Sequence, residues 1–464
     1  MTESPVGVTV DPPARVVATR IIGWAASIFH RIERHGGVVP PGPVLVVANH
    51  PNSLLDPLVV FRTAGRPTRP LAKAPLFDQV FVGSMLRVLG GLPVYRKQDD
   101  ASQMHRNEQT FDAAIEALRA GHAVQIYPEG ISHSEPALVP LRTGAARIAF
   151  GAELRSDWTL GLRLVPVGIT YRRKHLFRGT ALAFIGEPFT IERFRASYEK
   201  DAVAAVQELT EEIAGRLQQV TLNLTESEDI ELVETANRLY TREKGLQRWR
   251  EREDMADKLP RLQRFARGLA WLRANDPARH DRLRREVRRY HRFLKLLGAE
   301  EGDVPRKYQP GATGWYVLRE AVLLLLGLPF AVLGAILWAP AYFAPLLVLR
   351  AVRPPFEAVA TYKIATGFAA APLTALIGAL AAGILAGPVA ALLTFFLVPL
   401  LGLAAIAFFE RLRRVREDAR VFLRASEKRK EVDRLARMRA DLAAEFDRVL
   451  VEAPEILEGP ARTS

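Results

Sequence analysis

Two long runs without a charged residue dominate the pattern of the chain. The longer run is Ile364–Phe409, with 46 residues, and the shorter is Ala321–Leu349, with 29 residues. A membrane-spanning helix needs about 20 consecutive apolar residues, so these runs predict membrane segments within residues 320–410. The longer run can hold two spans, divided near Gly387-Pro388, and the shorter run has room for one.

Basic residues flank both runs and bear on the topology. They lie before residue 300, within residues 350–363 and within residues 411–439. Short loops rich in lysine and arginine stay on the cytoplasmic side of a membrane. With both flanks on that side, the shorter run must be re-entrant, and we expect a shallow hairpin that turns near Trp338–Pro345, followed by two true spans. Three spans with the C-terminus outside are the alternative.

Residues 36–200 alternate between short apolar runs typical of strands and segments with helical periodicity. The helical patterns lie near residues 99–119 and 144–154, and Gly121 ends the first of them. This alternation predicts an α/β domain in which helices flank a mixed sheet. The expected strands are 44–48, 92–95, 123–127, 163–171 and 181–185.

Three further segments are helical by their pattern. Within residues 1–35, apolar residues form one broad side, which predicts an amphipathic helix that lies in the membrane interface or packs on the neighbouring domain. Residues 201–310 form a strongly charged helical region. Residues 411–464 form a charged helix that we expect to pair with that region.

The charge of the chain favours an anionic partner. The chain has 64 Lys+Arg against 51 Asp+Glu, a net charge of +13, and residues 261–295 alone hold twelve basic residues against three acids. No zinc-finger, RNA-recognition or basic-zipper pattern accompanies this charge, so we expect membrane lipids and no nucleic acid as partner. A solvated helix face is the alternative for residues 261–295. The absence of cysteine excludes disulfides, thiolate catalysis and cysteine-ligated metals.

The segment Ala48-Asn-His-Pro-Asn-Ser-Leu-Leu-Asp-Pro57 offers a catalytic pair. His50 follows a predicted strand, turn-forming residues come next, and Asp56 before proline is a natural N-cap of a helix. We therefore expect His50 and Asp56 to face each other across a strand-to-helix turn. A histidine oriented by a carboxylate can act as a general base near neutral pH.

Three more blocks follow in order: Gly91-Leu-Pro-Val-Tyr-Arg96, Tyr127-Pro-Glu-Gly130 and Val165-Pro-Val167. Together with the His50 block they resemble the motifs of the glycerolipid (PlsC-like) acyltransferase superfamily. That superfamily includes bacterial lysophosphatidic acid and glycerol-3-phosphate acyltransferases. The resemblance covers residues 40–190, and the combination of four blocks in this order is far more specific than any one of them.

The resemblance implies a role for each matching residue. His50 matches the catalytic base, and Asp56 matches the aspartate that orients it. Arg96 matches the arginine that binds the phosphate of the acceptor, a task for which the fork of a guanidinium is suited. Glu129 matches the glutamate that contacts the glycerol part of the acceptor, and Gly130 permits a close backbone approach beside it.

The sequence departs from the family pattern in two blocks. The first is His-x5-Asp where the family has His-x4-Asp, so the turn must absorb one extra residue. The third continues with Ile131-Ser-His-Ser134 where the family has Thr-Arg-Ser, so the customary basic residue is missing. His133, Arg142 or Lys73 could provide the second phosphate contact in its place.

The resemblance thus implies an integral membrane O-acyltransferase of phospholipid synthesis with its catalytic domain on the cytoplasmic face. The acceptor would be glycerol 3-phosphate, dihydroxyacetone phosphate or 1-acyl-glycerol 3-phosphate, and the donor acyl-CoA or acyl carrier protein. We expect no metal and no cofactor, because the donor brings its own activated thioester. A non-catalytic membrane-associated scaffold that keeps the fold is the alternative.

Overall fold

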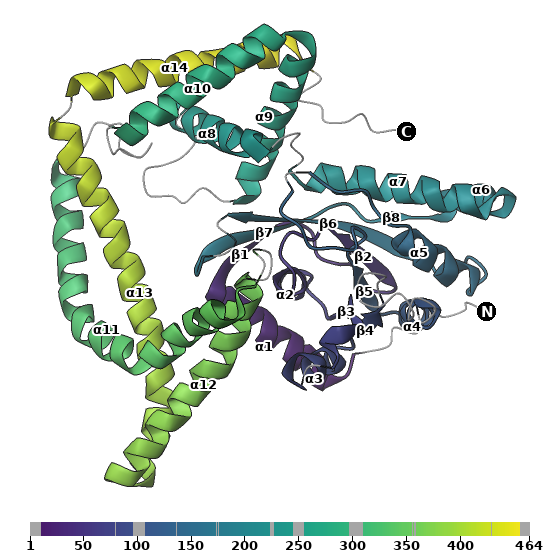
Figure 1. Ribbon diagram of the computed structural model, residues 1–464, viewed down its shortest axis with the longest axis horizontal. Coiled ribbons are helices and arrows are strands. Elements are labelled where there is room, and N and C mark those ends of the chain that lie inside the picture. Colours follow the sequence, from purple (N-terminus) through teal and green to yellow (C-terminus); the bar gives the residue numbers. More distant parts are fainter. Residues whose placement is uncertain are drawn as a thin grey trace.

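The structure is a computed structural model of the 464-residue chain. Figure 1 shows a sheet domain, a separate helical bundle and a group of long helices beside them. The residues described are 11–78, 80–95, 107–135, 137–172, 174, 176–222, 227–244, 255–296, 310–354, 356, 359–427 and 429–454.

The sheet domain is built on eight strands in the order β1-β7-β6-β2-β5-β3-β4, with β8 paired to β6. Strand β2 is parallel to its neighbours β5 and β6, whereas β6 and β7 are antiparallel. The prediction of a mixed sheet is therefore confirmed. The strands are β1 (His30–Gly36), β2 (Val44–Ala48), β3 (Thr68–Lys73), β4 (Leu92–Val94), β5 (Ala123–Ile126), β6 (Arg163–Arg172), β7 (Gly179–Ile185) and β8 (Phe189–Thr190).

Helices cover both faces of this sheet, and further helices form the bundle and the long apolar segments (Figure 1). In the sheet domain they are α1 (Pro13–Phe29), α2 (Leu55–Thr63), α3 (Val80–Val88), α4 (Asn107–Arg119), α5 (Gly144–Leu154), α6 (Arg195–Lys200) and α7 (Ala202–Val220), with short 3-10 helices η1 (Ala74–Leu76) and η3 (Glu192–Phe194). Beyond it they are α8 (Ser227–Glu243), α9 (Met255–Asn275), α10 (Pro277–Leu296), α11 (Pro310–Val352), α12 (Val359–Ala386), α13 (Pro388–Glu427) and α14 (Arg429–Glu452).

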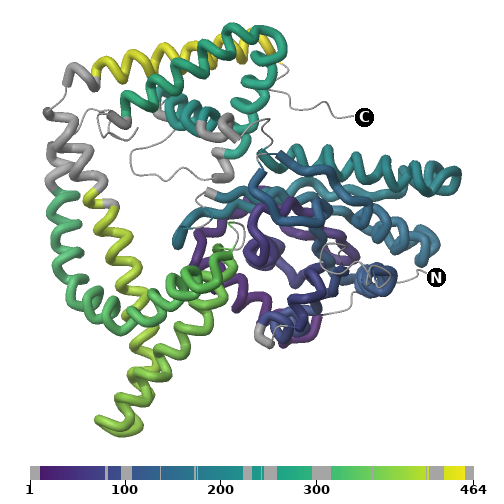
Figure 2. The backbone as a smooth tube through the Cα atoms, in the orientation of Figure 1, coloured from purple at the N-terminus to yellow at the C-terminus, as the bar shows by residue number. Residues whose placement is uncertain are grey.

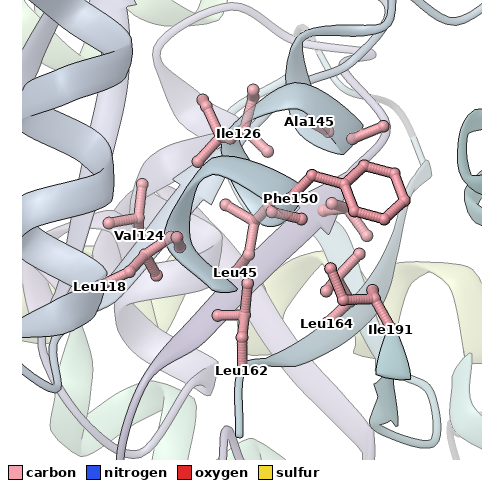
Figure 3. Close-up of a cluster of buried hydrophobic side chains, with 14 of the residues drawn as sticks. Leu45, Leu118, Val124, Ile126, Ala145, Phe150, Leu162, Leu164 and Ile191 are labelled. Atoms are coloured by element: carbon pink, nitrogen blue, oxygen red, sulfur yellow. The ribbon is translucent and has the colours of Figure 1, made fainter. Parts of the chain in front are cut away.

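Each face of the sheet carries its own hydrophobic core. On one face, side chains of β2 and β6 meet α4, α5 and α7, and Figure 3 shows Leu45, Phe150 and Leu164 within this cluster. On the other face, α1 and α2 pack on the same strands through Ala26 and Val59. Because both faces are covered, the middle strand β2 is buried at every position.

Two segments that we assigned to other regions belong to the sheet domain. Residues 30–35, assigned to the N-terminal helical segment, belong to β1 (His30–Gly36) and pair with β7. Helix α7, assigned to the charged helical region, packs on the sheet through Leu209 and Leu217. Strand β3 and helix α3 were not expected.

The charged helices α8, α9, α10 and α14 pack into one bundle with its own core. Leu239, Leu272, Tyr290 and Phe446 are buried together there, one from each helix. The C-terminal charged segment thus packs with residues 201–310 as predicted, but only through α14, because residues 411–427 continue α13.

In the described part of the chain, three helices are long and apolar enough to cross a membrane: Trp315–Val352, Val359–Ala386 and Pro388–Arg413. The division of the longer run at Gly387 is confirmed, because α12 ends at Ala386 and α13 begins at Pro388.

The expected hairpin near Trp338–Pro345 is wrong, because α11 continues as one helix through these residues. Helices tolerate proline in a membrane when neighbouring helices support the freed backbone groups. α11 packs along α13 at these residues, and the side chain of Trp338 donates a hydrogen bond to the carbonyl of Val398 in α13 at 2.6 Å. Figure 2 shows that α11 curves, so that its C-terminal end turns toward the sheet domain.

Candidate active site

Three of the predicted site residues lie at one edge of the sheet. Strands β2, β3 and β5 are mutually parallel through β5, so their C-terminal ends lie on the same side. His50 comes two residues after β2, Glu129 three residues after β5, and Lys73 is the last residue of β3. Open parallel sheets bind their ligands at this edge.

His50 and Asp56 contact each other as the spacing predicts. Nδ1 of His50 lies 2.7 Å from Oδ2 of Asp56, and the histidine side chain is 18% exposed whereas the aspartate is fully buried. Asp56 is not the N-cap that we expected, because α2 begins one residue earlier, at Leu55. The extra residue of His-x5-Asp is accommodated in a tight turn in which Ser53 has a φ of 33°.

The carboxylate of Asp56 is fully satisfied by protein donors. Besides His50, the backbone amide of Asn52 donates to Oδ2 at 2.8 Å, and the hydroxyl of Tyr171 donates to Oδ1 at 2.6 Å. A buried carboxylate is stable only when it is hydrogen-bonded in this way. Since an ionised carboxylate only accepts, Nδ1 of His50 carries the proton and Nε2 keeps a lone pair.

Two buried tyrosines form the floor of the site. The ring of Tyr127 stacks on the ring of His50, with centroids 4.3 Å apart. Burial, and secondly the charge of Asp56, raises the pKa of both Tyr127 and Tyr171 well above 10. Tyr171 therefore stays protonated and remains a donor to Asp56 at physiological pH.

Glu129 connects the two motif loops from within. Its Oε1 accepts the backbone amide of His50 at 2.7 Å, and its Oε2 accepts the amide of Val139 at 3.1 Å and a hydrogen bond from Nε2 of His133. Nδ1 of His133 accepts the amide of Glu135 at 3.2 Å, so both ring nitrogens of His133 are already used. This arrangement fixes the loop that carries His50, and the expected acceptor contacts of Glu129 and His133 stay predictions.

Arg142 and Lys73 are both exposed cations. Arg142 runs so close to Gly130 that a Cβ on the glycine would meet Arg142 Nε at 2.6 Å, and Gly130 has a φ of +72°. Lys73 lies opposite Val94 in the β3–β4 register, at the same sheet edge. In the described part of the chain, neither Arg142 nor Lys73 is paired with an acid. Arg96 lies outside the described residues, and its role stays a prediction.

Three residues of the site were missed by the sequence analysis. Tyr171 orients Asp56. Asn49 exchanges two hydrogen bonds with the backbone of Ile169, at 3.0 and 2.6 Å, and so fixes the end of β2 against β6. Lys174 donates to the carbonyl of Pro51 at 2.9 Å. All three contacts join segments more than 100 residues apart, and no local spacing signals them. Within the residues described, no cluster of His, Asp and Glu could hold a metal ion.

Part of the chain is similar to known acyltransferases. Residues 31–170 match the family described as Acyltransferase. The chain is 29% identical over 246 residues to glycerol-3-phosphate O-acyltransferase 2 of Saccharomyces cerevisiae, covering 51% of this chain and 31% of the yeast protein. It is 25% identical over 423 residues to an uncharacterised acyltransferase of Schizosaccharomyces pombe, covering 69% of this chain and 60% of that protein. The chain thus spans less than two thirds of the length of either relative.

A solved structure is also similar. The 1-acyl-sn-glycerophosphate acyltransferase PlsC of Thermotoga maritima is 21% identical, with a TM-score of 0.31, over 43% of this chain and 80% of the PlsC chain.

Proposed function

We propose that this chain transfers a fatty acyl group to a glycerol-phosphate acceptor. The match of residues 31–170 to the Acyltransferase family and the similarity to a yeast glycerol-3-phosphate O-acyltransferase support this proposal. The observation that carries the proposal is the His50–Asp56 contact of 2.7 Å, which leaves Nε2 of His50 able to accept a proton. The donor is the thioester of acyl-CoA or acyl carrier protein. Glycerol 3-phosphate is the first candidate acceptor, because it is named for the yeast relative, and 1-acyl-glycerol 3-phosphate is the second.

The reaction proceeds by general-base catalysis. Nε2 of His50 removes the proton of the acceptor hydroxyl, and the oxygen forms a bond to the thioester carbonyl carbon. The tetrahedral oxyanion collapses, the carbon–sulfur bond breaks, and the thiolate leaves with the proton from Nε2. Asp56 stabilises the imidazolium between these steps, and general-base assistance of this kind contributes roughly 10²–10⁴ in rate.

The acceptor phosphate binds the cations at the same edge. Arg142 and Lys73 are exposed and unpaired with acids in the described residues, and Arg96 follows β4 in the sequence. Arginine suits this task because its fork meets two phosphate oxygens at once. Binding of the phosphate holds the acceptor hydroxyl at Nε2 of His50, so the contact with the cations also aligns the reacting atoms.

The site faces a membrane. Helices α12 and α13 form a hairpin of two spans whose connection at Gly387 carries no charge, whereas arginines follow at Arg411 and Arg413. The positive-inside rule places the sheet domain on the cytoplasmic face. Helix α1 lies in the interface, with Val17, Ile21 and Trp24 exposed on one side.

An acyl-transfer assay tests this function. The full chain is reconstituted in phospholipid vesicles and offered labelled acyl-CoA or acyl carrier protein with glycerol 3-phosphate or 1-acyl-glycerol 3-phosphate. Labelled product from either acceptor is the expected result. No transfer with any donor–acceptor pair would favour the non-catalytic scaffold.

A further inference from the structure

The first turn of α12 reaches the catalytic turn. The backbone amide of Leu54, which lies between His50 and Asp56 in the sequence, donates to Oγ1 of Thr361 at 3.3 Å. Ala360 and Ile364 are buried in the same core as the face of α2 that packs on the sheet. A segment adjoining a membrane span thus supports the loop that presents the general base.

Lys174 contacts both motif loops and also the ring of Phe356, which precedes α12. Nζ of Lys174 donates to the carbonyl of Pro51 at 2.9 Å and to Oγ of Ser134 at 2.6 Å. The ring of Phe356, in the connection between α11 and α12, lies 4.9 Å from the same nitrogen. Lys174 therefore ties the His50 turn to the loop after Glu129, beneath an aromatic ring from the membrane segment.

The sheet domain is also fixed to α13 at a separate point. Nε of Arg178 lies 2.5 Å from Oε1 of Glu410, and the same guanidinium donates to the carbonyl of Ser27 at the end of α1 at 3.2 Å. Two separated attachments, to α12 and to α13, define how the long helices sit against the sheet domain. The contacts of Thr361 and Phe356 are then held in place by the packing of the whole helix group.

The catalytic turn needs such outside support. Ser53 has a φ of 33°, a region that non-glycine residues rarely adopt, and such a conformation persists only where neighbours over-determine it. Within the turn, the amide of Asn52 donates to Asp56. From outside it, Lys174 bonds to the carbonyl of Pro51 and Thr361 to the amide of Leu54.

We propose that Thr361 and Lys174 are positioning residues of the active site, and that Phe356 and the first turn of α12 support the catalytic turn. This inference rests on the proposed role of His50 as general base. It means that acyl transfer depends on the docking of α12 against the sheet domain, so that the site is complete only when the membrane segment is assembled.

Substitutions in the full chain, reconstituted in phospholipid vesicles, test the proposal. Thr361→Val removes the acceptor for Leu54 and keeps the shape, so kcat should fall roughly three- to tenfold with the KM of the donor unchanged. Thr361→Ser, which restores the hydroxyl, should recover the rate. The matched control is Thr374→Val on the same helix, because among the described residues the hydroxyl of Thr374 bonds to the carbonyl of Ala370 in its own helix and to no other group. Lys174→Met should lower kcat by about tenfold or more, because its hydrogen bonds are charge-assisted, and exposed Lys200→Met should not.

Hydrogen exchange of the Leu54 amide provides a readout that is independent of activity. Exchange should accelerate roughly fivefold or more in Thr361→Val and not in Thr374→Val. If the wild-type chain transfers no acyl group, the proposed function fails while this exchange still decides whether Thr361 supports the turn. Wild-type kcat and wild-type Leu54 exchange in Thr361→Val would overturn the inference.

Discussion

The hydroxyl of Tyr171 lies 2.6 Å from Oδ1 of Asp56, although 115 residues separate the two in the sequence. Strand β6, which carries Tyr171, is the neighbour of β2, which presents His50, so the sheet itself brings the tyrosine to the aspartate. The aspartate that orients the histidine is therefore held from α2 and from β6 together. This arrangement makes the role of Tyr171 testable apart from that of Asp56.

Tyr171→Phe should lower kcat while the fold is kept. The substitution leaves the ring in place and removes one donor to a buried carboxylate. Hydrogen bonds to charged groups contribute about 1.5–3 kcal/mol, so the expected loss is roughly ten- to a hundredfold. Steady-state kinetics should show little change in acceptor KM.

Tyr127→Phe is the matched control for Tyr171→Phe. Tyr127 stacks on His50 through its ring, and its hydroxyl donates to Gln125 instead of Asp56. Its removal should therefore cost much less activity. Wild-type kcat in Tyr171→Phe would show that Tyr171 acts through the packing of its ring alone.

Gly130→Ala should displace Arg142. The new Cβ would meet the side chain of Arg142, and the φ of +72° disfavours alanine by about 1–2 kcal/mol. Gly161→Ala is the control, because Gly161 has a φ of +64° and, in the described part of the chain, no atom beyond its two chain neighbours lies within 4 Å of where the new methyl group would sit. Both variants should lose stability in thermal unfolding, but only Gly130→Ala should raise the KM of the phosphorylated acceptor. Unchanged acceptor KM in Gly130→Ala would remove Arg142 from the phosphate site.

Arg96→Lys should impair acceptor binding even though the positive charge is kept. Lysine cannot reproduce the bidentate fork, so kcat/KM for the acceptor should fall roughly ten- to a hundredfold, with the donor KM nearly unchanged. Arg155→Lys is the control, since Arg155 is a surface residue that pairs with Asp112 and Glu116. Wild-type kinetics in Arg96→Lys would shift phosphate binding to Arg142 and Lys73.

Stability should fall below about pH 6.5 because of His30. Burial lowers the pKa of His30 from 6.5 to about 4. Between these two values the unfolded chain binds a proton that the folded chain does not, so the folded state loses up to about 3 kcal/mol as the pH falls. His30→Phe should reduce this fall in stability, measured as the fall in Tm by thermal unfolding from pH 7.5 to 4.5 (the acid limb). The same change at His35, a less buried histidine of β1, should leave the limb as in the wild type; a limb unaltered by His30→Phe would contradict the assignment.

The sequence was sufficient to predict those features that depend on local spacing. The apolar runs at β2, β5, β6 and β7 were found, and the turn between β2 and α2 predicted the His50–Asp56 contact. Each of these signals lies within about ten consecutive residues, where turn chemistry and periodicity act directly.

Other features depend on neighbours that are distant in the sequence. Strand β1 reads His-Arg-Ile-Glu-Arg-His-Gly, without apolar alternation, because it lies at the edge of the described sheet, next to β7. The prolines of α11 indicated a turn, but packing against α13 keeps the helix continuous. Tyr171, Lys174 and Thr361 have no motif, since only the assembled sheet and membrane helices bring them to the catalytic turn.

The most direct test of the account is the acyl-transfer rate of His50→Ala in the reconstituted full chain. The variant removes Nε2 from a partly exposed turn, so the protein should fold and insert as the wild type does. Acyl transfer should fall by about 10²-fold or more, while His35→Ala, away from the site, should retain wild-type turnover. Turnover within a few fold of the wild type in folded His50→Ala would contradict His50 as the general base.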